Sequence, residues 1–176
     1  IADYASRKGL LLRGHTLFWL PEKWYPKWLV AHDFGAQPAA KAEAMLREHV
    51  QTVCRRYGTR IYSYDVVNEA VQPETGLIRD TVVTKAPGHE APLDVMFQPA
   101  RAEAPHAQLV YNDYMSWEPD HRAHCADVLR LLEGFRKRGV PVDALGIQSH
   151  IEIYSLDPSS GVGPYDEAGW RRFLDE

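Results

Sequence analysis

The chain has 176 residues, of which 45% are apolar and 25% are charged, and its formal net charge is −4. This composition is typical of a globular protein rather than a disordered one, and no apolar run approaches membrane-spanning length. The small negative charge gives no reason to expect nucleic-acid or membrane partners.

Apolar segments and amphipathic segments alternate along the chain. In chain order, strands are predicted at residues 10–18, 60–67, 107–111 and 142–147. Helices are predicted at residues 38–57, 92–103, 119–138 and 165–176. This alternation predicts an α/β fold with a parallel sheet covered by helices. Right-handed crossovers would bring all four strand ends to one face.

The end of the second predicted strand is the most informative feature. Residues 60–67 are rich in Ile, Tyr and Val, and they stop at Asn68 and Glu69, an amide and a carboxyl side by side. Residues 71–76 then read as a loop. In an eight-stranded α/β barrel, catalytic groups gather at this rim. The alternative is that Asn68 and Glu69 only begin a solvated turn. The other strand ends bring further candidates to the same face: His15, Trp19, Asn112, Tyr114, Gln148 and His150.

Four motifs at these strand ends resemble glycoside hydrolase family 10, the retaining endo-β-1,4-xylanases. They are RGHTLFW at residues 13–19, DVVNEA at 65–70, YNDY at 111–114 and GIQSH at 146–150. The resemblance implies strands three to six of a (β/α)8 barrel, that is, a partial TIM barrel. A complete barrel needs about 250 residues. Residues 1–176 are therefore expected to form a single incomplete catalytic domain, truncated at both ends, with the nucleophilic Glu beyond residue 176.

The resemblance implies a role for the residues that end two of the strands. Glu69 is expected to be the catalytic acid/base, and Asn68 is expected to bind the 2-hydroxyl of the sugar under attack. Gln148 and His150 lie two residues apart, so a strand would direct both side chains to one side. His150 is expected to bond the nucleophile, with Gln148 in the same network.

Three further candidates are implied to line the substrate site. His15 is expected to support a strand-end partner, either Asp65 or Asn112. Trp19 is expected to lie against the sugar at the point of cleavage. For Tyr114 two interpretations remain open, a stacking platform on the leaving-group side or a core residue.

The implied function is hydrolysis of xylan or xylo-oligosaccharides by double displacement with retention, by a protein that is monomeric when full length. Because polymeric xylan cannot enter a cell, the resemblance also implies a secreted or periplasmic enzyme. The chain by itself is expected to be inactive. Two alternatives stay open: another retaining barrel glycanase, such as a cellulase or mixed glucanase, and a carbohydrate-binding pseudoenzyme.

The segment after the first predicted strand departs from the family pattern. The family usually has a His directly after the residue corresponding to Trp19, and this chain has Leu20 there. If Leu20 lies against the reacting sugar, a hydroxyl loses a polar partner, which Glu22 is a candidate to replace. The aromatic residues that follow either shape the sugar pocket or pack as a loop over the barrel rim: Trp24, Tyr25 and Trp28.

No cofactor or metal is expected. The histidines that could form a metal site by their spacing are His121 and His124, with His89 and His106 as possible partners. The three-residue interval between His121 and His124 fits solvent-facing or helix-capping side chains better than a ligand set. Cys54 and Cys125 fall on separate predicted helices and are predicted to be isolated buried thiols.

Overall fold

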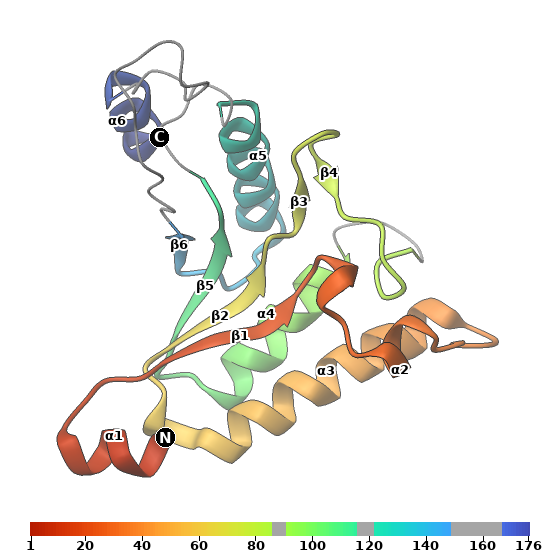
Figure 1. Ribbon diagram of the computed structural model, residues 1–176, viewed down its shortest axis with the longest axis vertical. Helices are drawn as coiled ribbons and strands as arrows, with labels where there is room; N and C mark the ends of the chain where they lie inside the picture. The colour runs from red at the N-terminus through yellow and green to blue at the C-terminus, as the bar shows by residue number, and fades with distance from the viewer. Residues whose placement is uncertain (86–90, 116–121, 149–166) are drawn as a thin grey trace.

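The computed structural model describes residues 1–85, 91–115, 122–148 and 167–176 (Figure 1). The sequence-based predictions for His89, His121 and His150 lie outside the described residues. No helix within the described ranges has both the length and the apolar character needed to cross a membrane.

The secondary structure alternates as the sequence predicts. The main sheet contains β1 (Arg13–Trp19), β2 (Ser63–Asn68), β5 (Gln108–Asp113) and β6 (Ala144–Ile147). The helices are α1 (Ala2–Lys8), α2 (Lys27–Val30), α3 (Pro38–Tyr57), α4 (Ala91–Glu103), α5 (Arg122–Arg138) and α6 (Glu167–Asp175). Two short 3₁₀ turns are η1 (Glu22–Trp24) and η2 (Gly58–Arg60), and a small hairpin pairs β3 (Val71–Gln72) with β4 (Leu77–Ile78).

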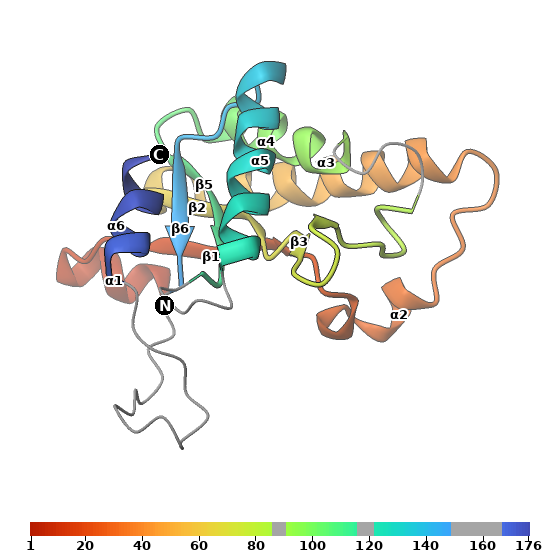
Figure 2. The same ribbon diagram turned by 90° about the horizontal axis from the view of Figure 1, so that it is seen from above.

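The main sheet has the order β1-β2-β5-β6, and each pair of neighbours is parallel. Helices α3 and α4 lie side by side against it (Figure 1 and Figure 2). In the register of the sheet, four residues lie side by side across the strands: Trp19, Asn68, Asn112 and Gly146. The α/β prediction is therefore confirmed, and the carboxyl ends of all four strands meet at one edge.

Helix α3 shows why these boundaries are readable from sequence. Pro38 occupies its first turn, where a missing N–H costs nothing, and Gly58 follows its last residue with a φ of 54°. Its buried side chains recur every fourth residue and face the sheet: Ala42, Leu46, Val50 and Cys54. The predicted range of 38–57 is confirmed.

The strands start later than predicted. The first was expected from residue 10, but Leu10 and Leu11 are exposed in the connection from α1, and pairing with β2 begins only at Arg13. The other three strands begin at Ser63, Gln108 and Ala144, one to three residues after the predicted starts.

The loop predicted at residues 71–76 is wrong at its first two positions. Val71 and Gln72 pair with Ile78 and Leu77 as an antiparallel hairpin. The turn closes at Gly76, whose φ is 67° and whose N–H donates to the Gln72 carbonyl at 2.8 Å. The sequence does not predict this hairpin because strands of two residues are too short to show an alternating pattern of apolar and polar residues.

Leu20 belongs to the core. It is fully buried among apolar side chains, and its backbone N–H donates to the Asn68 carbonyl at 3.0 Å. The hypothesis that Leu20 lies against the reacting sugar is therefore wrong. Successive residues of an extended segment point to opposite sides, so Trp19 and Leu20 face different environments.

Helix α5 buries the one described member of the histidine pair. His124 is 3% exposed and begins an apolar stripe that continues through Val128, Leu131 and Phe135. The expectation of a solvent-facing or capping His124 is wrong. The prediction for the two thiols is confirmed, since Cys54 and Cys125 are both free and buried.

Candidate active site

Glu69 follows β2 directly and is held in an unusual backbone conformation. Its φ is 55°, in the left-handed region that residues other than glycine rarely adopt. Its N–H donates to the Asn112 carbonyl at 2.9 Å, and its own carbonyl accepts from Arg79 Nε at 2.9 Å. The residue is only 9% exposed. Strand β2 and its neighbour β5 therefore place a carboxyl at the edge of the sheet and limit its contact with water.

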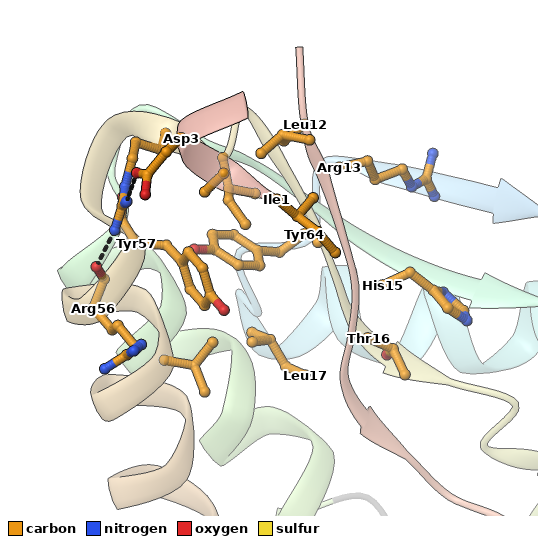
Figure 3. A pocket seen from close by; sticks show the side chains of 15 residues that line it. Ile1, Asp3, Leu12, Arg13, His15, Thr16, Leu17, Arg56, Tyr57 and Tyr64 are labelled. Carbon is orange, nitrogen blue, oxygen red and sulfur yellow. Dashed lines mark hydrogen bonds and ion pairs between the residues drawn. The ribbon is translucent and has the colours of Figure 1, made fainter. Parts of the chain in front are cut away.

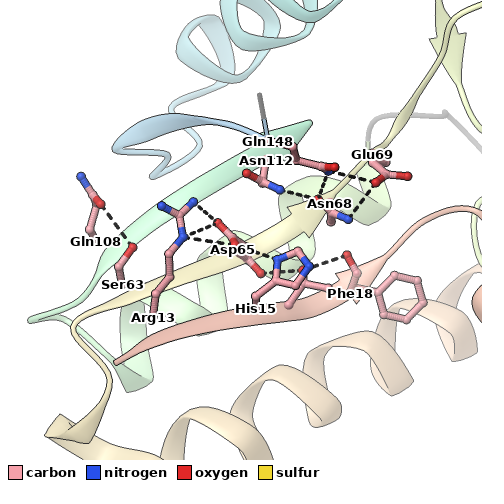
Figure 4. Close-up of polar contacts among 11 residues, drawn as sticks. Arg13, His15, Phe18, Ser63, Asp65, Asn68, Glu69, Gln108, Asn112 and Gln148 are labelled. Atoms are coloured by element: carbon pink, nitrogen blue, oxygen red, sulfur yellow. Dashed lines mark hydrogen bonds and ion pairs between the residues drawn. The ribbon is translucent and has the colours of Figure 1, made fainter. Parts of the chain in front are cut away.

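The hydrogen bonds to the Glu69 carboxyl from described residues are made to one of its two oxygens, Oε1. Gln148, at the end of β6, donates through Nε2 to Glu69 Oε1 at 2.9 Å (Figure 4). Asn68 Nδ2 lies 3.4 Å from the same oxygen. Among the residues that the structure describes, none donates a hydrogen bond to the other oxygen, Oε2. The sequence thus placed Gln148 correctly at the same edge as Glu69.

The Asn68 side chain, on β2, contacts residues on or directly after each of the other three strands. In one orientation its oxygen accepts from Asn112 Nδ2 at 2.6 Å and from Gln148 Nε2 at 3.1 Å. With the amide turned over, its oxygen accepts from Trp19 Nε1 at 2.9 Å. The indole N–H can only donate, so the turned orientation is the one that satisfies Trp19. The turned orientation directs the Asn68 amide nitrogen at Asn112 and Gln148, so the hydrogen bonds that the Asn68 oxygen accepts from these two residues belong to the first orientation.

Gly146 is required at this edge. A Cβ at this position of β6 would overlap the Asn112 side chain, whose amide must reach Asn68. The close approach of β5 and β6 therefore depends on the absence of a side chain there.

Asp65 is the centre of a second polar cluster on the same sheet. Its side chain is 3% exposed, and it accepts from His15 Nδ1 at 2.9 Å. Arg13 donates to both of its oxygens, and this hydrogen bonding raises the pKa of the Arg13 guanidinium (Figure 4). His15 thus bonds Asp65, one of its two expected partners, and the His15 side chain remains half exposed. Arg13 lies within the RGHTLFW motif but was not predicted to be a site residue.

Trp19 does not offer both of its ring faces to a ligand. It stacks on Trp24 with ring centroids 4.8 Å apart and an interplanar angle of 19°. Trp24 itself is 53% exposed, and Lys23 Nζ lies 5.0 Å from its ring centroid. The 3₁₀ turn η1 therefore extends the aromatic surface of Trp19 outward.

Tyr25 and Glu22, in the same segment, contact neighbouring protein residues. Tyr25 makes an edge contact with Phe18 at 5.3 Å and donates its hydroxyl to Thr81 at 3.3 Å. Glu22 accepts from the Val82 N–H at 2.7 Å, so its carboxylate anchors a neighbouring turn. The rim-packing alternative therefore holds for Tyr25, and the carboxylate of Glu22 is already engaged.

Tyr114 contacts protein side chains through both its ring and its hydroxyl. Its ring stacks on His124 with centroids 5.0 Å apart, and its hydroxyl accepts from Arg79 at 3.0 Å. It is half buried, and this burial raises the pKa of its hydroxyl. Arg79 was missed by the sequence analysis, because nothing in the sequence indicates that the hairpin would return this side chain to Glu69.

A cavity of about 820 Å³ lies at the opposite end of β1 (Figure 3). Its lining comes from α1, α3, β1 and the start of β2, and includes Leu12, Tyr57 and Tyr64. It follows the side of β1 that has no neighbouring strand among the described residues. This cavity therefore marks the edge of the sheet rather than the cluster around Glu69.

The side chains of the described ranges do not form a metal centre. No group of three or more His, Cys, Asp or Glu residues within those ranges is arranged to hold a metal ion. Among the histidines compared with ligand spacing, His106 instead bonds the Ile61 carbonyl at 3.1 Å.

Comparison with known proteins points to one family. The model of glycosyl hydrolase family 10 matches residues 1–163. Endo-1,4-beta-xylanase A of Caldicellulosiruptor saccharolyticus is 37% identical over 166 residues, which cover 92% of this chain and 46% of that protein. Endo-1,4-beta-xylanase B of Paenibacillus barcinonensis is 37% identical over 158 residues, covering 88% of this chain and 45% of that protein.

Solved structures give the same answer. The crystal structure of native xylanase 10B from Thermotoga maritima aligns with a TM-score of 0.79 and 27% identity, over 99% of this chain and 49% of that one. The chain thus spans about half the length of the curated relatives and solved structures that it matches. Its four parallel strands with their helices correspond to part of their TIM barrel.

Proposed function

This chain belongs to glycosyl hydrolase family 10, and we propose that it supplies the acid/base half of a retaining endo-1,4-β-xylanase. The observation that carries this proposal is the Glu69 carboxyl, which is nearly buried at the carboxyl end of β2 and bonded on one oxygen by Gln148. Oε2, which receives no hydrogen bond from the described residues, would give its proton to the departing glycosidic oxygen.

The reaction needs a second carboxyl. Retaining glycosidases attack the anomeric carbon with a carboxylate about 5–5.5 Å from the acid, and a covalent glycosyl-enzyme forms. We propose that this nucleophile comes from the remaining part of the barrel, beyond residue 176. Glu69 would first act as acid and then, as base, take a proton from the water that hydrolyses the intermediate.

The neighbouring side chains have proposed roles in holding the sugar. Asn68 would bond the 2-hydroxyl, an interaction that strengthens as the oxocarbenium-like transition state forms. Trp19 would contact the same sugar, and Tyr114 would lie on the leaving-group side. His15 supports this edge through Asp65, and His150 is proposed to bond the nucleophile.

The proposed substrate is xylan or its oligosaccharides. The complete enzyme would be a monomer that meets the polymer outside the cytoplasm, since xylan cannot enter a cell.

Replacing Glu69 tests the proposal in the complete enzyme. Glu69→Ala is expected to lower the rate on xylan by about 10²–10⁴-fold, because the poor leaving group needs the proton. Aryl β-xylobiosides with good leaving groups should still form the glycosyl-enzyme and then stall. Azide, which needs no general base, should restore turnover and give the β-glycosyl azide.

The matched control is Glu103→Ala, which removes a partly buried carboxylate that pairs with the exposed Arg55 on the helices, away from Glu69. That variant should keep its activity on xylan. Full activity of Glu69→Ala on xylan, or an α-glycosyl azide as the rescued product, would remove Glu69 from the proposed role.

A further inference from the structure

The backbone around Glu69 is held by side chains that lie behind the site. Because Glu69 has a φ of 55°, its conformation costs free energy that the surroundings must offset. The next residue, Ala70, donates its N–H to the Tyr111 hydroxyl at 3.2 Å. The Glu69 carbonyl accepts from Arg79 Nε at 2.9 Å. The side chains of Tyr111 and Arg79 therefore hold the two polar ends of one peptide group, the one that joins Glu69 to Ala70.

Tyr111 connects this backbone to a buried carboxylate. The side chain is fully buried on β5, and its hydroxyl donates to Asp113 Oδ2 at 2.5 Å. Burial raises the pKa of Tyr111 well above its ordinary value, and the nearby Asp113 raises it further. The hydroxyl therefore keeps its proton. The Tyr111 hydroxyl uses this proton to donate the hydrogen bond to Asp113, and a lone pair on the same oxygen accepts the Ala70 N–H.

Arg79 connects the same backbone to Asp113 by a second route. Arg79 Nη2 donates to the Tyr114 hydroxyl at 3.0 Å, and the Tyr114 backbone N–H donates to Asp113 Oδ1 at 2.8 Å. His124 also contacts Asp113 Oδ1, through Nε2 at 3.1 Å. Both routes from Glu69 thus end at one carboxylate that is fully buried and accepts from three donors.

We propose that Asp113 is a positioning residue, which directs the Glu69 carboxyl toward the scissile bond through Tyr111 and through the Arg79–Tyr114 pair. Asp113 does not touch the substrate in this role. The inference rests on the proposed function, since it assigns Asp113 to the acid/base step. Displacement of a catalytic group by about 1 Å can cost about 100-fold in rate, so loss of either route should weaken proton transfer.

The test compares two substrates that differ in their need for an acid. In the complete enzyme, Tyr111→Phe removes the hydroxyl that joins Ala70 to Asp113. We expect kcat/KM to fall about 10–100-fold on xylo-oligosaccharides, whose leaving group needs the proton. On a 2,4-dinitrophenyl β-xylobioside, whose leaving group needs none, the fall should be less than about threefold. A purely structural role would lower both values equally.

Two additional variants keep the test decisive. Arg79→Gln interrupts the second route at a half-buried residue and therefore serves if Tyr111→Phe fails to fold. It should also lower kcat/KM on the oligosaccharides much more than on the dinitrophenyl substrate. Tyr64→Phe makes the matched change in a buried tyrosine of β2 that has no contact with Glu69, and both rates should stay unchanged.

The outcomes separate this inference from the proposed function. Selective loss on the oligosaccharide supports the positioning role. Equal loss on both substrates, or no loss on either, overturns it while the proposed function stands. If the unaltered complete enzyme hydrolyses neither substrate, the proposed function is wrong and the positioning role is overturned with it.

Discussion

Two neighbouring strand ends of this sheet are held in different ways. At the end of β2, Arg79 and Gln148 donate hydrogen bonds to the carbonyl and the carboxyl of Glu69, and the Tyr111 hydroxyl accepts from the Ala70 N–H. At the end of β1, the chain is held mostly by packing: Leu20 enters the core, and Trp24 stacks on Trp19. Hydrogen bonds are directional and packing is not.

The difference matches what each region has to do. An acid/base must aim one oxygen at one bond, so its support must resist small rotations. A surface that receives a sugar ring needs apolar area in the right place, and packing supplies that. We therefore expect changes at the end of β2 to affect stability and rate together. Changes at the end of β1 should alter either stability or the kinetic parameters, but not both.

The largest effect on stability is expected from Asp113→Ala. The change leaves the Tyr111 hydroxyl, the His124 ring and the Tyr114 N–H without their acceptor in a buried place. We expect the free energy of unfolding, measured by urea denaturation, to fall by about 3–5 kcal/mol.

The matched control is Asp94→Ala, which removes a carboxylate paired with Arg138 at the surface. Its ion pair has a distance of 2.7 Å but is partly exposed, so its loss should cost about 0–1 kcal/mol. Equal losses for the two aspartates would show that the Asp113 cluster does not hold the end of β2 as a unit.

The next largest effect is expected at the end of β1, from Leu20→His. The substitution restores the residue usual in the family but places an imidazole in a fully buried apolar position. We expect a loss of about 2–4 kcal/mol in the free energy of unfolding. At temperatures where the variant is folded, kcat/KM on xylo-oligosaccharides should stay close to that of the unaltered enzyme.

Leu20→Met keeps the volume and should cost less than about 1.5 kcal/mol. A change of about tenfold in kcat/KM for Leu20→His with unaltered stability, the size of one modest hydrogen bond, would instead place this residue against the sugar.

The strand end at Glu69 was predictable because its signal is local. Apolar strand formers stop abruptly at an amide and a carboxyl, and parallel connections bring the strand ends together. Helix α3 was predictable for the same reason, since Pro38 and Gly58 bracket it. His124 could have been placed too. It lies four residues before Val128, on the buried face of α5, and helical periodicity alone predicts that position.

Other features depend on geometry that no short segment of sequence contains. Arg79 reaches Glu69 only because a hairpin of two-residue strands reverses the chain between them. The stacking of Trp24 on Trp19 depends on how η1 turns after β1. The hypothesis that Leu20 lies against the sugar came from its place in a family motif. The two-residue period of an extended chain already indicated that it points away from Trp19.

The smallest effect on stability is expected from Trp24→Ala, which tests whether this ring binds sugar or only covers the rim. Trp24 is 53% exposed, so its loss should cost less than about 1 kcal/mol of unfolding free energy. If the ring extends the sugar-binding surface of Trp19, KM for long xylo-oligosaccharides should rise about fivefold while kcat changes little. This pattern is expected because the ring lies beyond Trp19 and contributes equally to ground-state and transition-state binding.

Trp28→Ala is the control, since Trp28 is even more exposed and its ring packs at an edge against His32 instead of Trp19. This change should leave KM unaltered. Xylo-oligosaccharides of increasing length sharpen the result, because only those long enough to reach Trp24 should lose affinity in Trp24→Ala. If all lengths bind as before and the protein loses several kcal/mol of stability, Trp24 is a packing residue. In that case, packing alone would account for the whole segment after β1.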